Sequence, residues 1–192
     1  MNTKTATTKY KVTELIKERW SPRSFSDKII SIDDLNTLFE AASWAFSSGN
    51  VQPWYYIYAH RENKEAFEKL HKCLNPGNQP WTAHAAVLMA ILVRTKLENG
   101  KENKAAKHDV GAANATLALQ ATSMGISCHP MIGFDPAKTI ETLAINAAEI
   151  EPLVFVALGY QDVPEKLEEP FRSRETEPRS RKGLTEFTKQ LL

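Results

Sequence analysis

The sequence predicts an α+β fold, in which helices and strands follow one another without a regular strand–helix–strand alternation. Two segments carry this prediction. Residues 85–93 are apolar at every position, as expected of a strand covered on both faces. Residues 109–124 are rich in alanine and nearly uncharged, the composition of a helix buried on all sides. In a chain of 192 residues, such a helix would be central or would lie at a subunit interface.

Hydrophobic periodicity predicts the elements of the N-terminal half. Apolar residues recur at helical spacing in three segments, and a run of aromatic and aliphatic residues indicates a strand. The expected helices are 13–19, the segment from Ser31 to Ala42, and 62–74, and the expected strand is 55–59. Ser31 can cap the second helix, and Asp33 and Asp34 follow where the helix dipole favours carboxylates.

The C-terminal half predicts fewer elements. Gly125 would end the helix at 109–124, a further helix is expected at 136–144, and a strand at 153–158 is closed by Gly159-Tyr160. Residues 97–107 are charged and lack an apolar face, so they could form a mobile loop, a lid over a pocket or the exposed start of a helix. The tail after Val163 shows little periodicity.

Bulk properties bound the class of protein. The formal net charge is +1, so no global field favours nucleic acid or a membrane surface as a partner. The longest apolar run, nine residues, is too short to span a bilayer as a helix. Residues 1–11 have no secretory h-region and are expected to form a flexible segment before a single domain at 12–192. With only two cysteines, distant in sequence, we expect a reduced, cytoplasmic protein.

A first polar segment contains Arg19, Trp20, Ser21, Pro22 and Arg23. Two guanidinium groups with a hydroxyl between them, at the end of a helix, suit a phosphate, because arginine presents planar forked donors. A surface turn made by Ser-Pro explains the same residues about as well.

Three further segments are rich in polar or backbone-exposing residues. The segment from Ser47 to Trp54 contains hydroxyl and amide side chains and a glycine, and it leads directly into the expected strand. A polar loop beside a strand can offer many hydrogen bonds to a ligand. Pro130 and Gly133 would allow a flat ligand to approach the backbone closely. Residues 178–182 form a second basic cluster. Taken singly, a solvated turn explains Ser47 to Trp54 better than a binding loop does, an ordinary loop also explains Pro130 to Gly133, and the basic cluster is typical of solvated charge.

The sequence contains no recognisable catalytic or metal-binding motif. It lacks G-x-S-x-G, H-E-x-x-H, C-x-x-C, a Walker A motif and G-x-G-x-x-G, and its five histidines lack metal-ligand spacing. The chain therefore offers donors for a flat phosphorylated molecule but no nucleophile. A bound cofactor that performs the chemistry fits this pattern.

Taken together and in order, these segments resemble the FMN-dependent nitroreductase family over nearly the whole chain, from about Thr13 to Thr188. The family's R-x-S-x-R-x-F is similar to the segment 19–25, and its P-S-S-x-N-x-Q-P-W loop to 46–54, with Phe46 in place of the first proline. The remaining matches are Asp109-Val110-Gly111-Ala112-Ala113, Leu158-Gly159-Tyr160 and the pair Arg179 and Arg181.

The resemblance implies a three-layer fold, with a mixed or antiparallel sheet between helices, that forms an intertwined homodimer with FMN at the interface. NADH or NADPH would reduce the flavin, and a nitroaromatic, quinone or similar small acceptor would reoxidise it in a ping-pong cycle. Flavin N5 would carry the hydride, so no catalytic side chain and no metal is expected. The implied cofactor-binding residues are Arg19, Trp20, Ser21, Arg23, Ser48, Asn50, Gln52, Pro130, Met131, Ile132, Gly133, Arg179 and Arg181.

Departures from the family pattern leave alternatives open. His129-Pro130 stands where the family often has tryptophan, and Ile132 replaces an acidic residue of some members, so pocket shape and acceptor can differ. A specialised reductase, dehalogenase or flavin-cleaving enzyme, or an FMN-binding protein without turnover, is compatible with the same motifs. The pair Arg172 and Arg174 offers a second register for the tail, although Leu184 and Phe187 favour Arg179 and Arg181.

Overall fold

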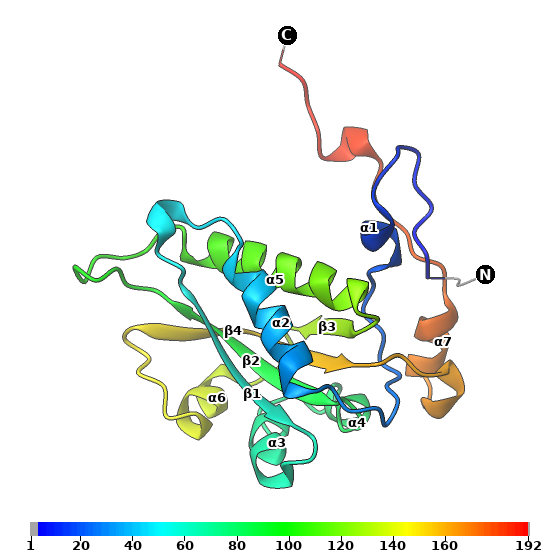
Figure 1. The fold of residues 1–192 in the computed structure, drawn as a ribbon, viewed down its shortest axis with the longest axis horizontal. Helices are drawn as coiled ribbons and strands as arrows, with labels where there is room; N and C mark the ends of the chain where they lie inside the picture. Colours follow the sequence, from blue (N-terminus) through cyan, green and yellow to red (C-terminus); the bar gives the residue numbers. More distant parts are fainter. Residues whose placement is uncertain (1–3, 192) are drawn as a thin grey trace.

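The computed structural model describes residues 4–191 and places one antiparallel sheet at its centre (Figure 1). The strand order is β1-β2-β4-β3, and every neighbouring pair is antiparallel. The strands are β1 (Trp54–His60), β2 (Val87–Arg94), β3 (Ser127–Met131) and β4 (Ile150–Gly159). The predicted α+β class is therefore confirmed, with all strand pairs antiparallel.

Helices cover both faces of the sheet and complete a three-layer arrangement (Figure 1). α2 and α5 lie on one face, and α3, α4 and α6 lie on the other. The helices are α1 (Glu14–Glu18), α2 (Ile32–Ser43), α3 (Lys64–His71), α4 (Gln79–Thr82), α5 (Ala106–Ser123), α6 (Pro136–Thr142) and α7 (Phe171–Thr176). Short 3₁₀ turns occur at Ser48–Asn50, Pro164–Lys166 and Leu184–Glu186.

The central strand β2 explains why its sequence has no polar alternation. Met89 and Ile91 face the layer of α2 and α5, whereas Leu88, Ala90 and Leu92 belong to the cluster on the opposite face. Each of these residues is at most 1% exposed. Since side chains alternate along a strand, covering both faces requires an apolar residue at every position.

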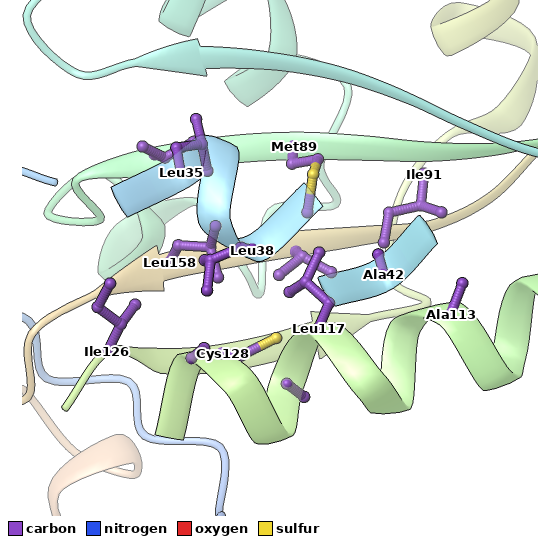
Figure 2. Close-up of a cluster of buried hydrophobic side chains, with 14 of the residues drawn as sticks. Leu35, Leu38, Ala42, Met89, Ile91, Ala113, Leu117, Ile126, Cys128 and Leu158 are labelled. Atoms are coloured by element: carbon purple, nitrogen blue, oxygen red, sulfur yellow. The ribbon is translucent and has the colours of Figure 1, made fainter. Parts of the chain in front are cut away.

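The layer between α2, α5 and the sheet is closely packed (Figure 2). Leu38 and Ala42 of α2 and Leu117 of α5 contribute to it and are almost fully buried. Ser31 caps α2 as predicted, because its side chain accepts a hydrogen bond of 3.0 Å from the Asp34 N–H. Small residues on α5 allow α2 to approach closely.

Among the described α-helices and strands, three are not predicted by the sequence patterns, namely α4, β3 and α7. β3 occupies part of the expected loop at 128–135, and α7 lies in the tail that shows no periodicity. β3 is an edge strand, with β4 on one side and no strand on the other. Proline is tolerated in an edge strand, because the open side has no neighbouring strand that needs its N–H. The last residues of the charged segment 97–107 form the first turn of α5, which begins at Ala106.

α5 is covered on one side only within the single chain. Val110, Ala113 and Leu117 are buried, whereas Gly111 and Ala115 are exposed. The expectation that this helix is buried on all sides is therefore not met within one chain. Its open face consists of small residues, so a second helix could approach it closely.

The first described residues lie beside α7 and the segment that follows it (Figure 1). The ammonium group of Lys4 donates a hydrogen bond of 2.7 Å to the carbonyl of Arg174, and the Ala6 N–H donates one of 2.9 Å to the carbonyl of Lys17. The C-terminal segment then extends away from the sheet and leaves Phe187 64% exposed. Flexibility of residues 1–11 and a domain start at residue 12 stay predictions. Among the helices that the structure describes, none is both long and apolar enough to cross a membrane.

Candidate FMN site

The segment from Arg19 to Arg23 leads from the end of α1 to the edge of the sheet, where Phe25 forms a bridge with Gln161. Arg19 and Trp20 line a hollow of about 330 Å³ beside the C-terminal end of α5. Its other walls include Gly125, Ile126 and Ser127, at the turn into β3. Nη1 of Arg19 lies 3.4 Å from the hydroxyl of Ser21, so these two predicted phosphate donors point into the same region.

The C-terminal tail brings further cations to Arg19. Burial lowers the pKa of Arg179, and the positive charges of Arg19 and Arg181 lower it further. Arg179 donates to the carbonyls of Lys4 and Lys17, at 2.8 and 3.0 Å, and so ties the tail to the N-terminus. Arg181 is exposed, and its only hydrogen bond among the described residues is one of 2.7 Å to the carbonyl of Ser180.

The alternative pair in the tail has different surroundings. Nε of Arg172 donates a hydrogen bond of 2.9 Å to the carbonyl of Leu167, within its own segment. Arg174 is exposed. Burial is the main cause that lowers the pKa of Arg23; the charge of Glu175 opposes it, and the positive charge of Arg174 adds to the lowering. The structure therefore ties Arg179 to Lys17, just before Arg19, and places Arg174 on α7 beside Glu175, the partner of Arg23.

Arg23 faces a different hollow from Arg19. It lines a space of about 360 Å³ together with Ser24, Asp27 and Lys166. Its backbone N–H donates a hydrogen bond of 2.8 Å to Oε1 of Glu175, which also lies 4.0 Å from the guanidinium. The guanidinium lies over the rings of Trp81 and Phe171, at 5.7 and 5.9 Å from their centroids.

The polar loop between α2 and β1 has an unusual backbone. Gly49, Asn50 and Gln52 have φ values of 58°, 56° and 52°, in the left-handed region that residues with side chains seldom adopt. The amide of Gln52 donates to the carbonyl and side-chain oxygens of Asn50, at 3.2 and 3.0 Å. Loops of this kind persist where neighbouring groups hold them.

Asp109, in the first turn of α5, is the group that holds this loop. Its side chain is 1% exposed, and its Oδ2 accepts hydrogen bonds from the Ser47 hydroxyl (3.0 Å) and the Ser48 N–H (2.8 Å). Nδ1 of His108 lies 3.0 Å from Oδ1. Burial would raise the pKa of Asp109, but these hydrogen bonds and the charge of His108 outweigh burial and lower it. The sequence contained a signal for this role, because Asp109 is a carboxylate in an otherwise nearly uncharged helix.

The segment 130–133 continues from β3 on the side of the sheet next to the arginine segment. Ile132 is 85% exposed. The carbonyl of Gly133 accepts a hydrogen bond of 3.0 Å from the Asn75 N–H and one of 2.9 Å from the side-chain amide of Asn78. Pro130 is exposed and Met131 is buried. The exposed part of this segment can contact a ligand, while the two hydrogen bonds to the Gly133 carbonyl keep the backbone in place.

His129 fixes the arginine segment to β3. The ring is 8% exposed, its Nδ1 lies 2.8 Å from the carbonyl of Pro22, and its centroid lies 4.5 Å from that of Trp81. Burial lowers the pKa of His129 to about 4, so the ring is neutral at pH 7 and Nδ1 carries the proton that it donates. Burial raises the pKa of the neighbouring Cys128 thiol to about 12, which makes it an unreactive thiol.

The polar loop at 47–52 and the hollow that Arg19 lines lie at opposite ends of α5 (Figure 1). Asp109 and the loop 47–52 lie at its N-terminal end, whereas Arg19 and the hollow lined by Gly125 lie at its C-terminal end. From Asp109 to Ser123, where α5 ends, the helix rises about 21 Å. Within one chain, the loop donors and the arginine donors therefore do not converge on one small ligand.

The larger part of the chain matches a known protein family. The profile of the Nitroreductase family matches residues 16–160. A protein from Streptococcus pyogenes serotype M6, named "Putative NAD(P)H nitroreductase Spy0809", is 26% identical over 196 residues, which cover 84% of this chain and 94% of that protein.

Solved structures show the same fold. A crystal structure described as an oxidoreductase containing FMN is 30% identical, with a TM-score of 0.91, and the match covers 99% of this chain and 96% of the other. A nitroreductase family protein from Clostridium difficile 630 is 24% identical, with a TM-score of 0.69, and covers 91% of this chain and 95% of its own.

Proposed function

Because this chain belongs to the nitroreductase family, we propose that it is an FMN-dependent oxidoreductase driven by NADH or NADPH. Bound FMN would supply the hydride chemistry, accepting two electrons from the nicotinamide and passing them to an acceptor. The proposed acceptor is a nitroaromatic, a quinone or a similar small molecule. The two described thiols, Cys73 and Cys128, are unpaired, which supports a cytoplasmic location.

The residues near the C-terminal end of α5 fit a phosphate. Arg19 lines the hollow there, Arg179 binds the carbonyl of Lys17, two residues before Arg19, and the positive charges of Arg19 and Arg181 both lower the pKa of Arg179. Without an anion these positive charges repel one another, and a phosphate would relieve this repulsion while accepting forked hydrogen bonds. Arg179 also binds two carbonyls and so holds the tail, whereas Arg181 is exposed and can bind the ligand. This gathering of cations is the observation that carries the proposal.

A second copy of the chain would complete the site. The loop donors Ser48, Asn50 and Gln52 lie too far from Arg19 to reach the same FMN within one chain. The exposed small residues Gly111 and Ala115 would allow α5 of two chains to pack closely. We therefore propose a homodimer in which each loop contributes to the partner's FMN site. The segment 130–133 would lie along the flavin ring, with the exposed Ile132 beside the acceptor.

Anaerobic flavin reduction tests the proposal. Purified protein is saturated with FMN, and NADH and NADPH are added separately while the visible flavin absorbance is followed. Loss of this absorbance, and its return when a nitroaromatic or quinone is added, is the expected result. A protein that binds no FMN would contradict the site. A protein whose bound FMN neither nicotinamide reduces would be an FMN-binding protein without turnover, and the proposed activity would be wrong.

A further inference from the structure

The loop that carries Ser48, Asn50 and Gln52 is held only in part by its own hydrogen bonds, such as those from the Gln52 amide to Asn50. Three of its residues have positive φ, and two of these, Asn50 and Gln52, carry side chains. The side chains of Ser48, Asn50 and Gln52 are not buried, so packing contributes little to keeping them in place. Hydrogen bonds from outside the exposed part of the loop therefore help to hold this conformation.

Those hydrogen bonds converge on one carboxylate. Oδ2 of Asp109 accepts from the Ser48 N–H at 2.8 Å and from the Ser47 hydroxyl at 3.0 Å. The same hydroxyl oxygen accepts a hydrogen bond of 2.8 Å from the Gln52 N–H. One buried oxygen thus controls both ends of the strained turn, directly at Ser48 and through Ser47 at Gln52.

The other oxygen of the carboxylate has a separate partner. Oδ1 of Asp109 pairs with Nδ1 of His108, whose side chain is 71% exposed. The His108 ring also lies 5.4 Å from that of Phe46, outside the turn. A change at His108 therefore disturbs the carboxylate without removing either contact to the loop.

We propose that Asp109 is a positioning residue of the flavin site, which acts through Ser47 to place Ser48, Asn50 and Gln52 for the cofactor. This inference rests on the proposed function. Asp109 is on α5, the helix that would pack against its copy in the dimer. It therefore ties the position of the loop to that helix, and so to the neighbouring subunit's site.

Four variants separate this role from a general loss of stability. Asp109→Ala removes both loop contacts, and Ser47→Ala removes only the relay to Gln52. His108→Ala is the matched control, because it removes a partner of the same carboxylate that makes no hydrogen bond to residues 47–52. Asp109→Asn keeps the shape and one acceptor oxygen, so its effects are expected to fall between those of Asp109→Ala and wild type.

The first measurement is amide hydrogen exchange of the protein without FMN. The Ser48 and Gln52 amides are expected to exchange at least about tenfold faster in Asp109→Ala. In Ser47→Ala only the Gln52 amide is expected to exchange much faster, and in His108→Ala both amides are expected to keep the wild-type exchange rates. Amides of β2 keep wild-type rates in all variants whose fold is intact. Unchanged exchange at both loop amides in Asp109→Ala would overturn the inference.

The second measurement uses FMN. Asp109→Ala and Ser47→Ala are each expected to bind FMN about tenfold more weakly. The midpoint potential of the bound flavin is also expected to fall, because donors to the reduced ring are displaced. His108→Ala stays close to wild type in both. If wild type binds FMN and neither quantity changes in Asp109→Ala, the positioning role is wrong. If wild type binds no FMN, the proposed function fails and the flavin role fails with it, while the exchange data still report whether Asp109 holds the loop.

Discussion

The backbone N–H of Arg23 donates a hydrogen bond of 2.8 Å to Oε1 of Glu175, and the two residues are 152 positions apart. Glu175 is 3% exposed, and its Oε2 has no hydrogen-bond partner among the described residues. Burial raises the pKa of Glu175, against the opposing effects of the Arg23 N–H and the charges of Arg23 and Lys4. The carboxylate therefore partly neutralises an arginine that the family resemblance assigns to the FMN phosphate.

Substitution of Glu175 by glutamine is expected to strengthen FMN binding, by about three- to tenfold. The glutamine carbonyl can still accept from the Arg23 N–H, but it no longer neutralises the guanidinium. Fluorescence titration of FMN measures the effect, and Glu177→Gln, at an exposed position of the same segment, is the control. Unchanged or weaker binding in Glu175→Gln would show that Arg23 does not contribute its charge to the phosphate.

His129 is expected to make the fold sensitive to acid. Its pKa in the folded protein is about 4, below the ordinary value of 6.5, so the unfolded chain takes up a proton first as the pH falls. Its contribution to the free energy of unfolding is complete above pH 6.5 and is lost as the pH falls towards 4. At pH 4 the loss is about 3 kcal/mol.

Urea unfolding at several pH values checks this expectation. Between pH 6.5 and 4, the free energy of unfolding of His129→Gln should fall by about 3 kcal/mol less than that of wild type, because glutamine does not titrate. The exposed His84→Gln is the control and should follow the wild-type profile. Parallel profiles for wild type and His129→Gln would contradict a buried neutral imidazole.

The sequence predicts the layers of this fold better than the details of the candidate site. β2 and α5 were recognisable because burial on two faces demands an apolar residue at nearly every position. β3 was not, because five residues that include Pro130 have no clear period and pair only in the context of β4. The Arg23–Glu175 contact was not predictable either, because it joins residues far apart in sequence. Asp109 was visible as a motif residue, but its role depends on how the loop folds back onto α5.

Arg179 and Arg181 are expected to respond differently to truncation. Arg181→Ala should weaken FMN binding by about ten- to a hundredfold with an unchanged melting temperature, because the exposed side chain holds no structural contact beyond its own neighbour. Arg179→Ala should also lower the free energy of unfolding, by about 1–3 kcal/mol, because the carbonyls of Lys4 and Lys17 lose their donor. Arg172→Ala, in the other register of the tail, is the control for FMN binding. An Arg181→Ala protein with wild-type FMN affinity would remove Arg181 from the phosphate site.

The open face of α5 gives a test of the shared site. Ala115→Arg places a long charged side chain on this exposed helix face and is expected to produce monomers that bind FMN weakly. Ala137→Arg makes the same change at an exposed position of α6, on the opposite side of the sheet, and should remain dimeric. Sedimentation velocity and FMN titration are measured on the same samples. Monomers of Ala115→Arg that keep the full FMN affinity would contradict a site built from two chains.

Gly159, the last residue of β4, is expected to be intolerant of a side chain because of Phe25. A Cβ atom at this position would lie 2.7 Å from Cδ1 of Phe25 and 3.1 Å from its Cγ. Phe25 is 4% exposed and belongs to the core beneath the arginine segment, so its ring cannot move aside freely. Gly159→Ala should lower the free energy of unfolding by about 1–3 kcal/mol, while Gly77→Ala, where a Cβ meets nothing within 4 Å, should change it little. Because Phe25 follows Arg23 by two residues, the strained variant is also expected to bind FMN more weakly. Equal stabilities of the two alanine variants in urea would show that the glycine in the Leu-Gly-Tyr strand end is not required by this contact.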